Sequence, residues 1–197
     1  MYAWVRVLLC LYALVAAEVA IAGVQTPMSL RIDPGGSRVW FDADARLHSF
    51  RGETRQISGR LTLLNTSPPQ VADARVIIDA GSLATGNVDR DADMHRDYME
   101  VRTFPTIEFS ITDLLPSQSV SNSPDWEIIM RGKLVVHGVT RTVDVPATVH
   151  LATDHLTARG QVRLDMRDYN IRVPRLLLIP MKSQVLIGFE VVARPET

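Results

Sequence analysis

Cysteine is nearly absent from this sequence of 197 residues. Its one cysteine, Cys10, lies in an apolar segment near the N-terminus. A chain with a single cysteine cannot form an internal disulfide framework, and it lacks the ligands of cysteine-rich zinc sites. The fold must therefore depend on an apolar core, for which this length is sufficient.

An excess of charge of either sign is also missing. Lys plus Arg number 21 and Asp plus Glu number 22, so the formal net charge is −1. Nucleic-acid-binding proteins normally carry a basic patch or stripe, and this balance gives no reason to expect one. Apolar residues make up 46% of the sequence and charged residues 22%, which excludes a disordered chain and indicates one ordinary folded domain.

The short motifs of common enzymes are absent as well. The sequence contains no Gly-x-Ser-x-Gly elbow, no His-Glu-x-x-His helix and no glycine-rich phosphate loop before a helix. Among the histidines, His48 shares a strand face with Asp42 and Asp44. Such residues point outward in a line, whereas a metal site needs three or four ligands that converge. We therefore expect neither an enzyme nor a bound metal or cofactor.

The N-terminus carries a long apolar run. Residues 7–17, after Arg6, contain no charge, and Ala20-Ile21-Ala22 then supplies the small-x-small pattern of an export cleavage site. We therefore expect residues 1–22 to be a secretory signal peptide and the protein to be periplasmic or secreted. Cleavage after Ala22 would also remove the one cysteine.

The domain boundaries follow from this segment. Residues 23–29 are expected to form a linker, and residues 30–195 one folded domain. The alternative for the N-terminus is an uncleaved membrane anchor from Val7 to Val24, although Glu18 interrupts it and the apolar run is short for a bilayer.

Alternation of apolar and polar residues dominates the remaining sequence. In the segment 38–47, Val39, Phe41 and Ala43 share one face and Trp40 lies on the other. This period of two predicts antiparallel strands with one face in water. The alternating runs are 38–47, 57–63, 74–78, 107–111, 128–136, 143–151, 156–164 and 185–191, with a short leading strand at 30–33.

Eight such strands are best accommodated by a closed barrel, because closure removes exposed strand edges; a two-sheet sandwich is the alternative. One segment, 87–101, breaks the alternation and is rich in Asp and Arg. It predicts a short helix near residues 89–100, with Asn87 or Asp89 as its N-cap. The fold class is therefore all-β and antiparallel, with one short helix.

Small residues recur on the apolar faces of these strands. An eight-stranded barrel is just wide enough to be filled by its own side chains or to hold one small ligand. Many small inward residues favour an apolar cavity that an apolar guest can occupy. The alternative is a filled core in which the glycines permit bends. The residues in question are Ala43, Ala45, Gly59, Ala74, Gly132, Ala147, Ala158 and Gly160.

A second feature lies near the C-terminus. Pro174 and Pro180 bracket the apolar tetrad Leu176–Ile179, and Arg172, Arg175 and Lys182 flank it. Apolar residues ringed by cations suit the mouth of a cavity that meets a lipid tail and an anionic head group. The alternative is a strand edge that packs onto the barrel while its cations are solvated.

Six short strings follow one another along the sequence: HSFRG (48–52), IDAGSL (78–83), TGN (85–87), RD (90–91), FPTIEF (104–109) and GKLVVHGVT (132–140). Their order and spacing resemble those of the YceI-like family of exported lipocalin-like proteins. The resemblance covers about residues 30–193. It implies an eight-stranded lipocalin-like barrel whose apolar interior holds a polyisoprenoid chain, such as a polyprenyl phosphate or a quinone tail, in the periplasm or outside the cell. It supplies no catalytic residues.

Two sets of candidate binding residues follow. The set expected to line the cavity is Phe41, Ala43, Ile57, Leu61, Phe109, Met130, Val145, Ala158 and Phe189. The set expected at its mouth is Phe50, Arg90, Tyr98, Arg172 and Arg175. For Arg90, an ion pair with Asp91 that fixes the helix over the barrel is the favoured interpretation, and a head-group contact is the alternative.

The function expected from these observations is that of an exported carrier or sequestering protein for an isoprenoid lipid or quinone, with transient membrane-surface contact and no nucleic acid. One alternative is a stress-related interaction module with a filled barrel, whose protein partner meets Trp40 and the apolar tetrad. Another is an enzyme acting on an isoprenoid, which would need His48, His95, Tyr98 and Asp91 in one polar cluster.

Overall fold

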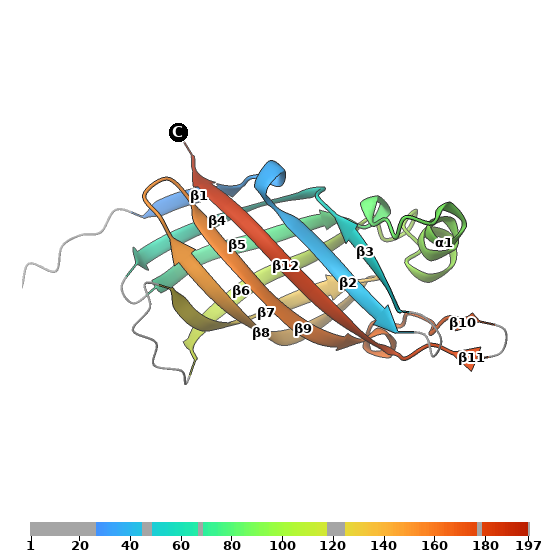
Figure 1. Cartoon of the computed structure of the whole chain (residues 1–197). Coiled ribbons are helices and arrows are strands. Elements are labelled where there is room, and N and C mark those ends of the chain that lie inside the picture. Colours follow the sequence, from blue (N-terminus) through green and yellow to red (C-terminus); the bar gives the residue numbers. More distant parts are fainter. Residues whose placement is uncertain (1–26, 45–48, 67–68, 118–124, 177–178, 197) are drawn as a thin grey trace, which may run out of the picture.

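The computed structural model describes residues 27–44, 49–66, 69–117, 125–176 and 179–196. Ten strands form one sheet, in the order β1-β4-β5-β6-β7-β8-β9-β12-β2-β3 (Figure 1). The strands are β1 Met28–Ile32, β2 Arg38–Asp44, β3 Ser49–Thr54, β4 Ile57–Thr66, β5 Pro69–Asp79, β6 Thr106–Pro116, β7 Trp126–Val136, β8 Val139–Leu151, β9 Leu156–Asp165 and β12 Gln184–Pro195.

The sheet closes into a barrel. An additional antiparallel pairing between β1 and β12 joins the strands β1, β4 to β9 and β12 into a ring of eight. Every pairing in this sheet is antiparallel, and β2 and β3 continue from β12 beside the ring. The expected all-β, eight-stranded antiparallel barrel is therefore confirmed.

One strand of the wall is broken in the middle. β1 and β2 both pair with β12, through Ile32 opposite Ala193 and through Val39 opposite Phe189. Between them lies the 3₁₀ turn η1 (Pro34–Gly36), where the fully buried Ser37 accepts a hydrogen bond from the Val192 N–H (2.9 Å). The Ser37 hydroxyl thus replaces a ladder bond that the break would leave unmade.

A helical segment lies at one end of the barrel, away from the C-terminus (Figure 1). It comprises α1 (Val88–Asp93) and a π-helical turn, η3 (Met94–Tyr98). Asn87 caps α1, because its side-chain oxygen accepts a hydrogen bond from the Arg90 N–H (2.9 Å). The expected helix and its Asn87 cap are therefore observed, although only its first part is α-helical.

Four short elements complete the described part of the fold. The 3₁₀ turn η2 (Ala80–Ser82) precedes α1, and η4 (Met166–Tyr169) follows β9. Strands β10 (Arg175–Leu176) and β11 (Ile179–Pro180) form a small hairpin that projects near α1 in Figure 1. No helix among the described residues is long and apolar enough to cross a membrane. The expected signal peptide lies outside the described residues.

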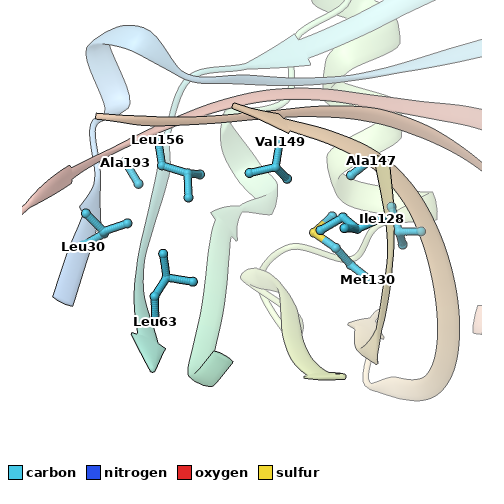
Figure 2. Close-up of a cluster of buried hydrophobic side chains, with 9 residues drawn as sticks. Leu30, Leu63, Ile128, Met130, Ala147, Val149, Leu156 and Ala193 are labelled. Atoms are coloured by element: carbon cyan, nitrogen blue, oxygen red, sulfur yellow. The ribbon is translucent and has the colours of Figure 1, made fainter. Parts of the chain in front are cut away.

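Apolar side chains form two buried clusters inside the barrel. The larger one includes Leu30, Leu63 and Leu156, and Figure 2 shows the labelled side chains of this cluster. The smaller one consists of Val136, Tyr169 and the neighbouring Ile171, near the helical segment. These clusters occupy only part of the barrel interior.

Candidate ligand-binding site

A cavity of about 700 Å³ occupies the barrel interior. Its lining comes from the inward faces of every barrel strand and from β2, β3, α1, η3 and η4. Nearly all lining side chains are apolar, and the charged ones are Arg60, Arg90, Asp93 and Asp165. A volume of this size lies within the range of small-molecule binding sites. The filled-core alternative is therefore wrong for this barrel.

Eight of the nine residues expected to line the cavity do contribute to its wall. They are Phe41, Ala43, Leu61, Phe109, Met130, Val145, Ala158 and Phe189. Ile57 does not line the cavity, although it is buried with only 2% of its surface exposed. It begins β4 directly after the turn from β3, so the surrounding protein covers its side chain completely.

The inward glycines do not supply the empty volume. At Gly52, Gly132 and Gly160, an added Cβ would overlap the ring of Phe41, Phe109 and Phe189, respectively. Each phenylalanine ring therefore covers a glycine of a neighbouring strand, an arrangement known from aromatic rescue of glycines in sheets. Among the small residues expected to create space, only Ala43, Ala74 and Ala158 line the cavity, and Ala45 lies outside the described residues.

A tryptophan shows the same packing. Trp40 lies over Gly188 and only 8% of its surface is exposed. The guanidinium carbons of Arg38 and Arg51 lie 5.2 Å from its ring centroid. Arg51 in turn binds Asp42, and this contact lowers the pKa of the Asp42 carboxyl. Trp40 is thus covered by its neighbours, which removes one of the two features that favoured an interaction module.

Arg90 connects the helical segment to the barrel. Its guanidinium carbon lies 4.3 Å from the ring centroid of Phe50, and both residues line the cavity. Its Nε donates a hydrogen bond to the Thr85 hydroxyl (2.7 Å), which itself donates to the Asp91 carboxylate (2.5 Å). The expected direct ion pair between Arg90 and Asp91 is therefore replaced by a bridge through Thr85.

The other residues expected at the mouth fall into different places. Tyr98 lines the cavity. Arg172 does not line it; this exposed side chain donates a hydrogen bond to the Asp97 carbonyl oxygen (3.0 Å). The side chain of Arg175, like those of the apolar tetrad, lies outside the described residues. Backbone pairing does place Leu176 opposite Ile179 in the β10–β11 hairpin.

The turn η4 contributes lining residues that the alternation did not predict. Asp165 precedes η4, accepts hydrogen bonds from the Arg167 N–H (3.0 Å) and side chain, and accepts another from the Ser183 hydroxyl (2.8 Å). The Arg167 side chain is the main reason why the pKa of Asp165 is lowered. This anchored turn carries Met166 and Tyr169, which line the cavity together with Ile171.

The histidines that the structure describes have other contacts. Among the described residues, no group of three or more His, Cys, Asp or Glu side chains could hold a metal ion. His95 Nε2 lies 2.8 Å from the Leu83 carbonyl oxygen, and His150 Nδ1 lies 2.7 Å from Asp125. His48 lies outside the described residues. The polar cluster needed by an isoprenoid-modifying enzyme is therefore not assembled in the described part of the chain.

Comparisons with known proteins agree with the barrel. The model of the YceI-like domain matches residues 30–193. No curated protein sequence matches the chain. Fifteen chains from solved structures match it. Three of them share only 16% to 21% of their residues with this chain, so they bear on the fold alone.

The first of these structures is BcnA from Burkholderia cenocepacia, with a TM-score of 0.69, 21% identity and coverage of 82% of this chain and 98% of that one. The second is a polyisoprenoid-binding domain from Saccharophagus degradans implicated in plant cell wall breakdown, with a TM-score of 0.65, 16% identity and coverage of 86% and 99%. The third is the YceI protein of Campylobacter jejuni, with a TM-score of 0.52, 16% identity and coverage of 65% and 74%.

Proposed function

The chain belongs to the YceI-like family, and from that premise we propose that it is a binding protein, not an enzyme, that holds an isoprenoid chain inside its barrel. The observation that carries the proposal is the apolar cavity of about 700 Å³. A similar fold is found in a domain that binds polyisoprenoids, which supports the same ligand class.

The binding energy would come from removing apolar surface from water. Burial of one CH₂ group contributes about 0.8 kcal/mol, so each prenyl unit adds several such increments before the cost of ordering the chain. Phe41, Phe109 and Phe189 would contact the tail, because all three line the cavity. Arg90 and Phe50 would lie beside it at the helical end.

The test is identification of a lipid that copurifies with the protein. We expect native mass spectrometry of gently purified protein to show a bound species, and organic extraction to release an isoprenoid lipid or a prenylated quinone. Protein that is ligand-free after gentle purification, and that takes up no prenylated quinone from mixed micelles, would contradict the proposal.

A role in carrying or sequestering the lipid requires export, which we also propose. The supporting feature is the apolar run 7–17 followed by Ala20-Ile21-Ala22. N-terminal sequencing of protein from the periplasm of an expressing bacterium should begin at Gly23. Protein that keeps its first residues and sediments with the membranes would instead indicate an anchor.

A further inference from the structure

Tyr169 carries a polar group for which the protein provides no partner. Its side chain lines the cavity, and only 3% of the residue is exposed. The hydroxyl oxygen is buried and has no hydrogen-bond partner among the described residues. Buried hydroxyl groups in folded proteins are normally hydrogen-bonded, because leaving one unpaired costs its hydration. The unpaired hydroxyl of Tyr169 therefore needs an explanation.

The surroundings of Tyr169 are apolar. Val136 and Ile171 form a buried cluster with it. Partly buried apolar and aromatic side chains pack against this cluster: Tyr98, Met99, Ile107, Leu134, Val139, Leu164 and Met166. Burial raises the pKa of the Tyr169 phenol, so the group keeps its proton at neutral pH and can donate a hydrogen bond.

The backbone around Tyr169 is firmly held. The Met166 N–H donates to the Ser183 carbonyl oxygen (2.9 Å), and the Ile171 N–H donates to the Met166 carbonyl oxygen (3.0 Å). Arg141 Nε also donates to the carbonyl oxygen of Asp168 (3.0 Å). These bonds hold the backbone of the turn on both sides of Tyr169, so the residue has a fixed place beside the cavity.

We propose that the Tyr169 hydroxyl donates a hydrogen bond to the polar end of the bound isoprenoid, and that this end is an uncharged acceptor such as a quinone carbonyl. The inference rests on the proposed function and adds the residue and the head-group class to it. An incoming carbonyl oxygen would satisfy the buried hydroxyl, and its lack of charge suits the apolar surroundings.

A phosphate head group fits this cavity less well. The two cations that line it are already engaged, since Arg60 donates to Glu196 (2.9 Å) and Arg90 donates to Thr85 (2.7 Å). The other charged lining residues, Asp93 and Asp165, are paired with Arg96 and Arg167, so they offer no free positive charge to an anion. A lone phenol cannot offset the loss of hydration of a phosphate.

The experiment compares three ligands that share a tail of two prenyl units and differ at one end. They are a prenylated benzoquinone, the prenyl phosphate and the prenyl hydrocarbon. Quenching or shift of tryptophan fluorescence reports binding, because Trp126 lines the cavity. We expect Tyr169→Phe to weaken quinone binding about tenfold, which corresponds to one hydrogen bond, and to change hydrocarbon and phosphate binding less than about twofold.

Thr112→Val is the control, because it removes a hydroxyl group from an exposed residue of β6 that does not line the cavity. It should leave all three affinities within about twofold of wild type. The unliganded Tyr169→Phe protein should melt no lower than wild type, since the substitution removes an unpaired buried hydroxyl. A clear fall in its melting temperature would show that the hydroxyl has a structural partner and would overturn the proposal.

A second measurement uses the wild-type protein. The infrared carbonyl band of a ¹³C-labelled quinone should shift to lower frequency on binding, and the shift should vanish in Tyr169→Phe. An unshifted band, unchanged quinone affinity in the variant, or an equal loss for the phosphate would overturn the assignment of Tyr169. If wild-type protein bound none of the three ligands, the proposed function itself would fail, which is a distinct result.

Discussion

Phenylalanine rings pack against glycines of neighbouring strands in the wall of this barrel. At Gly132, an added Cβ would overlap the backbone oxygen of Ser110 and the ring of Phe109. We expect Gly132→Ala to lower the free energy of unfolding by about 1–3 kcal/mol, because the close-packed wall has no room for the methyl group. Urea unfolding measures this change.

Gly81→Ala is the control for that substitution. A Cβ at Gly81 would lie 3.4 Å from the nearest Asp79 carboxylate oxygen, an ordinary van der Waals distance. Its effect should be below about 0.5 kcal/mol, as for most surface changes. Equal stability losses in the two variants would refute the packing argument.

Ala158 offers the most direct way to fill the cavity. It lines the cavity from β9, between Val149 of β8 and Val191 of β12. We expect Ala158→Trp to abolish copurification of the lipid, because the indole would occupy the volume of the tail. The far-UV circular dichroism spectrum should stay that of wild type, because an open cavity accepts the added ring.

The control for Ala158→Trp is Gln161→Trp, which places the same side chain at an exposed position of the same strand. This variant should keep its lipid. Retention of lipid by both variants would indicate that the ligand lies elsewhere, whereas unfolding of Ala158→Trp would indicate that the cavity is too rigid to accept a ring.

Alternation predicts the direction of a side chain but not its surroundings. Phe109 and Phe189 were therefore placed correctly in the cavity wall, because only their face of the strand mattered. Ile57 points inward as well, yet it is fully covered at the start of its strand. Tyr169 lies in a turn with no alternation, so no periodic pattern could assign it to the interior.

At the scale of elements, the position of the turn η4 depends on the carboxylate of Asp165. Asp165 accepts hydrogen bonds from Arg167 and Ser183, and the contact with Arg167 lowers its pKa below the ordinary value of an aspartate. A lowered folded-state pKa adds stability above the unfolded-state pKa of about 4, and this stability is lost as the pH falls from there. Asp165→Asn should therefore reduce stability at pH 7.

The pH dependence of stability shows whether the charge of Asp165 is the reason for this loss. The difference in stability between wild type and Asp165→Asn should narrow as the pH falls below about 4, because the wild-type carboxylate then takes up its proton. Urea unfolding at several pH values measures this difference in stability. Asp73→Asn is the control, because Asp73 is exposed. A difference that stays constant with pH would show that the charge of Asp165 is not responsible.

Long elements with a clear period were predictable, and short ones were not. The strands from β4 to β9 appear where alternation indicated them, because each has many inward apolar residues. Strand β3 (Ser49–Thr54) was missed, since its inward residues are Phe50, Gly52 and Thr54, and only the first is a large apolar side chain. The break at Pro34–Gly36 consists of turn-forming residues, but no pattern in the sequence indicates that the Ser37 hydroxyl restores the ladder.

At the scale of the whole molecule, closure of the sheet explains both the stability and the empty interior. Strand edges in the ring pair with each other, so the wall is held by backbone hydrogen bonds that do not require a filled core. This global property could be predicted from eight alternating runs. The size of the cavity could not, because it depends on how rings such as Phe109 lie over their glycines.

Because the closed barrel does not need a ligand to fold, removal of lipid should lower the free energy of unfolding without unfolding the protein. We expect delipidated protein to keep its circular dichroism spectrum at 25 °C. Adding a prenylated quinone at a hundredfold excess over its dissociation constant should stabilise the fold by about 2.7 kcal/mol. For a chain of this size that corresponds to a rise in melting temperature of about 5–10 °C.

Calorimetry would separate cavity binding from adsorption to the surface. Transfer of a prenyl tail into the apolar cavity should give a negative heat-capacity change that grows with each added prenyl unit until the cavity of about 700 Å³ is full. Ala158→Trp protein should lose both this heat-capacity change and the rise in melting temperature. If the variant kept them, the tail would bind outside the barrel, and the closed wall would serve only to hold the fold.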